Sequence, residues 1–225
     1  MYKQLLIFFF LITNSLPAQE IFDYKARYAF TNSKVTMEGT RELKTMPDGK
    51  RTLTFDARNA LGKIKIRSEF RENKNLFSTE IYSVKAKVTI FTQERVLKFD
   101  QENATLNSYG KYKWVKDLPK NLEIFDPLNA QLKIRKMISQ GVESFSLLLP
   151  EMKTGEIKSN DYFLKASQEC KVGEKVYQCK IVQRYRPHED RTTTYFIAPM
   201  LDFLIVRMED QDEDGDTLLE LKNLL

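Results

Sequence analysis

Residues 63–70 read Lys-Ile-Lys-Ile-Arg-Ser-Glu-Phe, a strict alternation of charged residues with apolar or small ones. Successive side chains of a β-strand point to opposite faces of a sheet, so this pattern predicts a strand with one buried face and one solvated face. The same period of two recurs in residues 24–30, 52–58 and 84–90. Such strands are typical of antiparallel sheets that are covered on one side. No strand–helix–strand rhythm occurs, which argues against a parallel sheet.

One segment lacks this alternation and predicts a helix over residues 127–140. Asp126 is a favourable N-cap, Pro127 suits the first helical position, and Gly141 can end the helix. Apolar residues fall on one side (Ala130, Ile134, Met137 and Ile138) and on roughly the opposite side (Leu128 and Leu132). A helix that is apolar on two sides is usually surrounded by protein. We therefore predict a mainly β (α+β) fold, a curved antiparallel sheet or incomplete β-barrel with one covering helix.

The first 18 residues have the three-part layout of a secretory signal peptide. Lys3 provides a positive start, residues 5–12 form an apolar run, and small or turn-forming residues lead to Ala18. A membrane anchor is the alternative, but a bilayer span needs about 20 apolar residues. We therefore expect cleavage after Ala18, export to the periplasm of a Gram-negative envelope, and a single β-rich domain over residues 19–225.

The composition is that of a folded protein, with 42% apolar and 30% charged residues. The formal net charge is +5, and removal of the signal peptide takes away Lys3 and no acidic residue, which leaves +4. Charges of both signs are spread along the chain, unlike the clustered basic face of a nucleic-acid-binding protein. We expect no nucleic-acid partner, whereas weak attraction to anionic lipid headgroups, and hence peripheral membrane contact, is compatible with this charge.

The two cysteines lie in a segment, residues 165–183, that predicts a β-hairpin. A two-residue turn at Glu174 and Lys175 would place Cys170 directly opposite Cys179, close enough for a disulfide. Export to an oxidising compartment permits that bond. A disulfide is therefore expected, and two unrelated buried thiols are the alternative.

The sequence offers little for catalysis. Its single histidine, His188, lies in a polar turn, whereas a zinc site needs three or four ligands and a Ser–His or Cys–His pair needs a positioned histidine. The Ser-x-x-Lys match at residues 108–111 lies in a turn rather than at a helix start, so we treat it as chance. No phosphate-binding loop or dinucleotide fingerprint is present. We expect no cofactor and no enzymatic activity.

The acidic run at residues 210–216 resembles the start of a calcium loop, Asp-x-Asp-x-Asp-Gly, with Asp210, Asp212 and Asp214 as candidate ligands. The glutamate expected six residues after the glycine is replaced by Leu221, and the flanking residues predict strands instead of helices. A charged hairpin turn is the favoured interpretation. A loose calcium site, in a secreted calcium-binding protein or hydrolase, is the alternative.

From residue 96 onward the order of features resembles an exported bacterial family. A strand ends in Phe99-Asp100, a turn follows at Gly110, Phe125-Asp126-Pro127-Leu128 opens the helix, and residues 192–199 end in Ala-Pro. On these features the chain resembles domain-of-unknown-function family 3108 over about residues 21–225. That family has no assigned activity. Its architecture is similar to that of the lipoprotein carrier and receptor proteins LolA and LolB, which hold acyl chains in the concavity of an incomplete antiparallel barrel.

The resemblance implies a monomeric, non-catalytic half-barrel that binds a hydrophobic or lipid-like ligand. Burial of an acyl chain would contribute about 0.8 kcal/mol per methylene, the helix would act as plug or lid, and surface Lys and Arg would meet an anionic headgroup. The residues that we expect to line the cavity, each of which also fits an ordinary core position, are Trp114, Phe125, Leu128, Leu132 and Ile134. The alternative is an envelope assembly or adaptor protein that binds another protein through an exposed strand edge or apolar patch.

Overall fold

A computed structural model describes residues 20–33, 35–73, 76–88, 91–186, 189, 191–211 and 215–225. The expected signal peptide and His188 lie outside these ranges. The described chain forms fourteen strands, one α-helix and one short 3-10 helix. They are β1 (Tyr24–Asn32), β2 (Thr36–Thr45), β3 (Lys50–Arg58), β4 (Gly62–Asn73), β5 (Leu76–Val88), β6 (Phe91–Asp100), β7 (Thr105–Gly110), β8 (Trp114–Asp117), α1 (Ala130–Ser139), β9 (Ser144–Pro150), β10 (Ile157–Val172), β11 (Lys175–Tyr185), β12 (Thr192–Ala198), η1 (Pro199–Leu201), β13 (Leu204–Gln211) and β14 (Thr217–Leu224).

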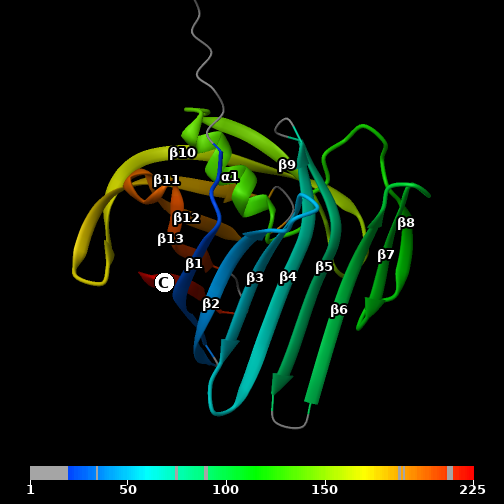
Figure 1. Cartoon of the computed structure of the whole chain (residues 1–225), viewed down its shortest axis with the longest axis horizontal. Coiled ribbons are helices and arrows are strands. Elements are labelled where there is room, and N and C mark those ends of the chain that lie inside the picture. The colour runs from blue at the N-terminus through cyan, green and yellow to red at the C-terminus, as the bar shows by residue number, and fades with distance from the viewer. Residues whose placement is uncertain are drawn as a thin grey trace, which may run out of the picture.

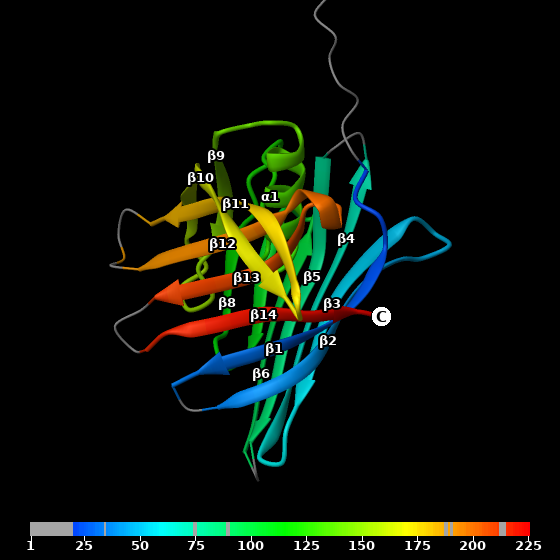
Figure 2. The same ribbon diagram turned by 90° about the vertical axis from the view of Figure 1, so that its left-hand side faces the viewer.

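All fourteen strands belong to one antiparallel sheet (Figure 1). Strands β1 to β8 form one meander and β9 to β14 form a second. The two meanders join where β1 pairs with β14, and these strands lie side by side in blue and red in Figure 2. Strands β8 and β9 end the sheet without pairing with each other, so the sheet curls but does not close. The predicted curved, incomplete barrel is confirmed.

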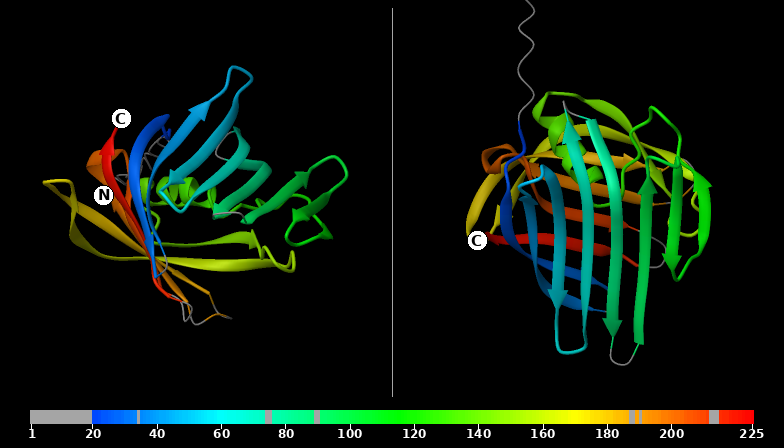
Figure 3. Two further views of the ribbon diagram at one scale, coloured as in Figure 1. Left: turned by 90° about the horizontal axis from the view of Figure 1, so that it is seen from below. Right: turned by 45° about the vertical axis from the view of Figure 1, so that its right-hand side comes forward.

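Helix α1 lies on the concave side of the curled sheet (Figure 3), and we call that side the inner face. The main hydrophobic core is built there from α1 and from β2–β7 and β9–β13. A second buried cluster surrounds the two cysteines. No helix within the described ranges is long and apolar enough to cross a membrane.

The predicted helix is present but starts later than expected. Residues 127–129 form a turn, and α1 runs from Ala130 to Ser139. Gly141, with φ +76°, ends it, because this left-handed conformation is easy for glycine. The covering helix and its end are therefore confirmed, whereas the boundaries 127–140 were too wide at the start.

The β10–β11 hairpin turns one residue earlier than predicted. Gly173 and Glu174 form the two-residue turn, in place of Glu174 and Lys175. Gly173 has φ +58°, and glycine is the preferred first residue of one of the tight hairpin turns. Shifting a turn by one residue moves every cross-strand pair by two. Cys170 and Cys179 are therefore not directly opposite, and the predicted register was wrong.

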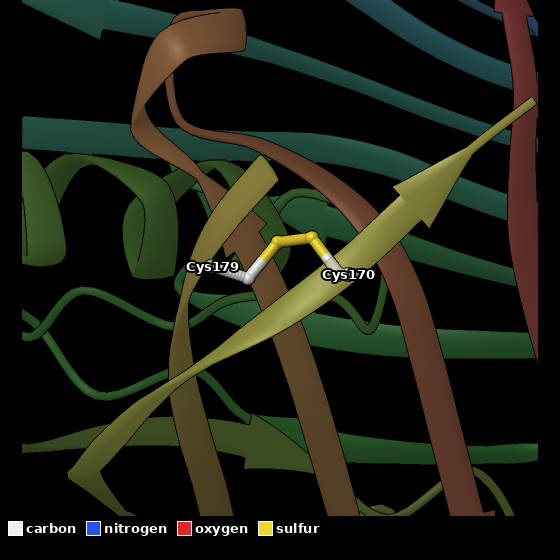
Figure 4. The surroundings of a disulfide bond; sticks show 2 residues. All are labelled: Cys170 and Cys179. Atoms are coloured by element: carbon white, nitrogen blue, oxygen red, sulfur yellow. A yellow bond between two sulfur atoms is a disulfide. The ribbon is translucent and has the colours of Figure 1, made fainter. Parts of the chain in front are cut away.

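The disulfide between Cys170 and Cys179 nevertheless forms (Figure 4), which confirms the predicted bond. Cys170 lies opposite Tyr177 and Cys179 lies opposite Gln168, so the bond joins diagonal neighbours whose Cα atoms are 6.0 Å apart. A β-bulge at residues 166–167 inserts one extra residue into β10. That residue reverses the face to which later side chains point. The bulge lies outside the loop from Cys170 to Cys179, so it is the turn at Gly173 that places both cysteines on the same face of the hairpin.

Removal of the Cys170–Cys179 bond should lower stability without changing the fold. The closed loop is short, so we expect a loss of about 2–3 kcal/mol in the free energy of unfolding. The measurement is chemical denaturation with and without dithiothreitol. The Cys170→Ala/Cys179→Ala variant is the control, because its stability should already be low and should not respond to the reductant. Equal sensitivity of variant and parent to dithiothreitol would contradict the assignment.

Candidate ligand-binding face

The start of α1 is held to the sheet by the buried carboxylate of Asp126. Its Oδ1 accepts the backbone N–H groups of Leu128 (2.7 Å) and Asn129 (2.9 Å), and its Oδ2 accepts the Ser68 hydroxyl of β4 (2.6 Å). Asn129 returns the contact by accepting the Asp126 N–H at 2.9 Å, and its amide donates to Thr79 on β5 (2.9 Å). The predicted N-cap position was therefore wrong, because Asn129 is the N-cap of α1. Asp126 instead binds the turn that precedes the helix, and with Asn129 it attaches this turn to β4 and β5.

Burial raises the pKa of Asp126 to about 7. The hydrogen bonds from Ser68 and from the backbone of Asn129 and Leu128 act in the opposite direction, because they favour the ionised form. Loss of hydration outweighs them, since the side chain is fully enclosed in the core. The attachment of α1 is therefore sensitive to pH near neutrality.

Charged side chains fasten the later turns of α1 to both halves of the sheet. Arg135 donates from Nη2 to the Asp202 carbonyl (2.9 Å) and from Nε to the Phe203 carbonyl (3.1 Å), just before β13. Lys136 forms an ion pair with Glu72 on β4. Breaking buried contacts of this kind is costly. The helix is therefore built as a fixed plug rather than as a lid.

A buried polar layer lies between α1 and the sheet. Arg41 on β2 and Arg135 are each only 2% exposed. Arg41 donates from Nη1 to the Gln131 side chain (2.7 Å) and stacks over Tyr28. Among the described residues, neither Arg41 Nε nor Arg135 Nη1 has a hydrogen-bond acceptor. Sequence reasoning missed this layer, because one arginine in an alternating strand gives no sign that it faces inward.

The five residues predicted to line a cavity lie in or against one core cluster. Phe125, Leu128, Leu132 and Ile134 are buried members of it, and Trp114 is half-buried at its edge. The cavities that the structure describes are lined by other residues. In this conformation the packing is that of an ordinary core, so contact with a ligand stays a prediction for these positions.

Trp114 joins the two unpaired ends of the sheet. Its indole N–H donates to the Met152 carbonyl in the β9–β10 loop (3.3 Å). A Cβ atom at Gly155 would lie 2.6 Å from the Trp114 ring, so only glycine allows the ring to pack this closely. A side-chain contact therefore takes the place of the backbone hydrogen bonds that would close a barrel.

Part of the inner face beyond α1 stays accessible, and we call it the open strip. It consists of Ile64 and Ile66 on β4 and their cross-strand partners Ala86 and Val84 on β5, all half-buried. Arg95 on β6 lies opposite Val84 and is also half-buried. The strip offers an apolar surface with a cation beside it. Such a surface suits an alkyl chain that carries an anionic group.

A hollow of about 710 Å³ lies on the opposite, outer face of β1–β4. Charged and hydroxyl side chains line it, among them Arg27, Glu38 and Asp56. An apolar ligand would gain little there, because burial against polar side chains removes their hydration without supplying apolar contacts.

The candidate calcium ligand Asp210 is engaged by its own chain. Its carboxylate accepts the Thr193 hydroxyl (2.7 Å) and pairs with Arg191. Burial alone would raise the pKa of Asp210, but the hydrogen bonds from these residues and the charges of Arg191 and Arg186 together outweigh burial and lower the pKa. Asp212 and Asp214 lie outside the described residues. Within the described ranges, no group of three His, Cys, Asp or Glu side chains could hold a metal ion.

Comparison with known proteins identifies a similar fold but gives no information about activity. No family model matches the chain, and no curated protein matches it. Among solved structures, the chain is similar to the crystal structure of a β-barrel-like protein of the domain of unknown function DUF1849 from Brucella abortus. The TM-score is 0.56 at 11% identity, over 90% of this chain and 98% of that chain.

At this identity the likeness concerns the fold alone. It agrees with the curled, open sheet described above and links that sheet to a barrel-like protein of unknown function. Family 3108, which the order of sequence features resembles, is not singled out by these comparisons.

The raised pKa of Asp126 predicts a pH dependence with a definite sign. A carboxyl group whose pKa is higher in the folded than in the unfolded state stabilises the fold below about pH 4, and this contribution is lost as pH rises through about 7. Asp126→Asn keeps a neutral acceptor for both backbone N–H groups. The variant should match the parent at pH 4 and be more stable at pH 8, by up to about 4 kcal/mol at about 1.4 kcal/mol per pKa unit.

Chemical denaturation of both proteins across this pH range measures the difference. Other carboxylates titrate alike in parent and variant, so their effects cancel. If Asp126→Asn destabilises the protein more at pH 8 than at pH 4, the three hydrogen bonds outweigh burial and the predicted sign is wrong.

Proposed function

We propose that this chain is an exported, non-catalytic binding protein of the Gram-negative envelope that holds a hydrophobic or lipid-like ligand against the open strip. The observation that carries the proposal is an apolar inner face only partly covered by α1, which leaves Ile64, Ile66, Val84 and Ala86 half-buried. Contact with an alkyl chain would complete their burial. At about 0.8 kcal/mol per methylene, a chain of about eight buried methylenes would contribute roughly 6 kcal/mol before the costs of binding.

Export to the periplasm is part of this proposal. The layout of residues 1–18 supports it. The Cys170–Cys179 disulfide also supports it, because such bonds persist mainly in oxidising compartments. Relationship to family 3108 belongs to the same proposal, since that family is exported.

The proposed ligand position differs from a cavity under a moving helix. The contacts of Asp126, Arg135 and Lys136 hold α1 at both ends, so opening the core would break several buried hydrogen bonds and an ion pair together. Binding against the open strip needs no such movement. Leu132 and Ile134 then act as core residues that hold the plug in place, without touching the ligand.

A second candidate function is an adaptor that binds another protein at the free edge of the sheet. Val115 on β8 is 65% exposed and Tyr109 on β7 is 52% exposed, and the sheet register puts both on the outer face. Exposed apolar side chains beside an unpaired edge strand favour addition of a strand from a partner.

The lipid proposal predicts extra mass on the native protein. The mature chain, purified from the periplasm, should carry a bound species in native mass spectra and lose it after solvent extraction. Val84→Gln should abolish the bound species, because a polar side chain in the open strip would have to lose its hydration. Val96→Gln is the matched control, since Val96 is a half-buried outer-face residue of the neighbouring strand β6.

Parent protein that is empty before extraction, and that does not take up a fatty acid or phospholipid afterwards, would overturn the lipid proposal. Equal loss of ligand in both glutamine variants would show that the ligand does not bind at the open strip. An empty protein that instead recovers a specific envelope protein, with recovery lost in Val115→Lys, would support the adaptor.

A further inference from the structure

Basic side chains gather on the outer face at the far ends of β3, β4 and β5. All of them are exposed. We call this group the basic tip, and it consists of Arg58, Lys63, Lys65, Arg67, Lys85 and Lys87. The strand ends project at the bottom of the molecule in Figure 1, away from α1.

The register places like charges directly opposite each other in the basic tip. Lys63 lies between Arg58 and Lys87, and Lys65 lies opposite Lys85. Like charges in directly opposed cross-strand positions destabilise a sheet. The arrangement therefore costs stability in the isolated protein, and an anionic surface would relieve that cost.

Acidic residues neutralise the basic tip only at its margins. Asp56 lies opposite Lys65, and Glu94 lies opposite Lys85 at 3.9 Å. Glu38 lies opposite Arg58. Glu69 on β4 pairs with Arg67 at 2.8 Å. Six basic residues thus face four acidic ones, which lie on β2, β3, β4 and β6.

The other end of the same strands is paired quite differently. Lys50 contacts Glu80 at 2.7 Å, and Arg71 contacts both Glu80 (3.1 Å) and Asp48 (3.0 Å). In the basic tip, by contrast, Arg58 and three of the four lysines have no ion pair with any residue that the structure describes. On these three strands, the unbalanced charge lies at one end.

An ordered turn places an apolar side chain beside these cations. Leu61 in the β3–β4 turn is 61% exposed. Asn59 fixes the turn, because its Oδ1 accepts the N–H groups of Leu61 (2.8 Å) and Gly62 (3.0 Å). A hollow of about 440 Å³ at this turn is lined by residues 58–63 and Lys87. Exposed leucine in a rigid turn, with basic residues around it, is the combination that binds at a membrane interface.

We propose that the basic tip docks on the surface of an anionic phospholipid bilayer. The lysines and arginines contact lipid phosphates, and Leu61 enters the boundary between headgroups and acyl chains. The register favours a bilayer over an acidic protein, because the cations form an array across three adjacent strands with an apolar anchor at its end. The basic tip lies on the outer face, so docking does not require a ligand in the open strip on the inner face.

The test is co-sedimentation of the mature chain with vesicles of phosphatidylcholine alone or mixed with phosphatidylglycerol, at physiological ionic strength. The parent protein should bind only the mixed vesicles, and high salt should weaken binding. The variant with Lys→Gln at positions 63, 65, 85 and 87 should lose about fivefold for each lysine, at least about a hundredfold in total. The matched control replaces Lys165, Lys171, Lys175 and Lys180 of the β10–β11 hairpin and should stay within about twofold of the parent.

A second measurement tests insertion. Leu61→Cys carries an environment-sensitive fluorophore, whose emission should shift to shorter wavelength on mixed vesicles. Met200→Cys, at a position 82% exposed in η1, should show no shift. The two native cysteines do not compete for label, because they form the disulfide.

Parent protein that does not prefer the mixed vesicles would overturn the proposal and favour an acidic protein partner. Equal loss in the two lysine variants would also overturn it, because net charge rather than the basic tip would then set binding. Val84→Gln should bind vesicles like the parent, so failure of the ligand proposal and failure of docking are separable. Folding is checked by the melting temperature, which the tip variant should keep or raise, since it removes like-charge pairs.

Discussion

The structure depends on a helix that fills the concave face of a sheet that is not closed by hydrogen bonds. An open sheet of fourteen strands would leave one whole apolar face wet, and α1 covers much of it. The position of α1 rests on Asp126, which binds the turn leading into the helix and the Ser68 hydroxyl of β4 with one carboxylate. A single buried acid thus links the local geometry of a helix start to the curvature of the sheet.

Most of the fold follows from local patterns. The alternation in residues 63–70 predicts β4, and the Asp126-Pro127 start predicts α1, because both patterns act over a few neighbouring residues. Such patterns fail where one inserted or shifted residue changes which side chains lie opposite each other in a hairpin. The bulge at residues 166–167 and the turn at Gly173 shift the β10–β11 pairing, so the disulfide was predicted correctly from a wrong register. Strand β9 was not predicted from the sequence, because its run of leucines does not alternate with polar residues.

The candidate site was harder to predict than the fold. Leu132 and Ile134 are apolar for the reason given by the sequence, a helix with two covered sides, but their neighbours come from distant strands and fill the space around them. The open strip arises because α1 ends before the sheet does, and no local pattern states where one element stops covering another. The inward position of Arg41 has the same origin, since its burial is created by Gln131 and Tyr28 across the core.

Charged side chains are distributed unevenly along the strands. The outer faces of β3–β5 are ion-paired at one end and carry unbalanced cations at the other end. The same strands contribute Ala57 and Ile64 to the inner face, so the two faces of one sheet serve the core and the charged surface.

The pairing of β1 with β14 has a consequence for how the chain folds. The strands β1 and β14 meet near the middle of the sheet, and their pairing is the only backbone ladder that joins the two meanders among the described strands. The sheet cannot be assembled until the final strand is available, because no earlier segment provides the partner of β1 on that side. Long-range pairing of this kind folds slowly. For the export that we propose, this delay would favour an unfolded chain until β14 can pair with β1.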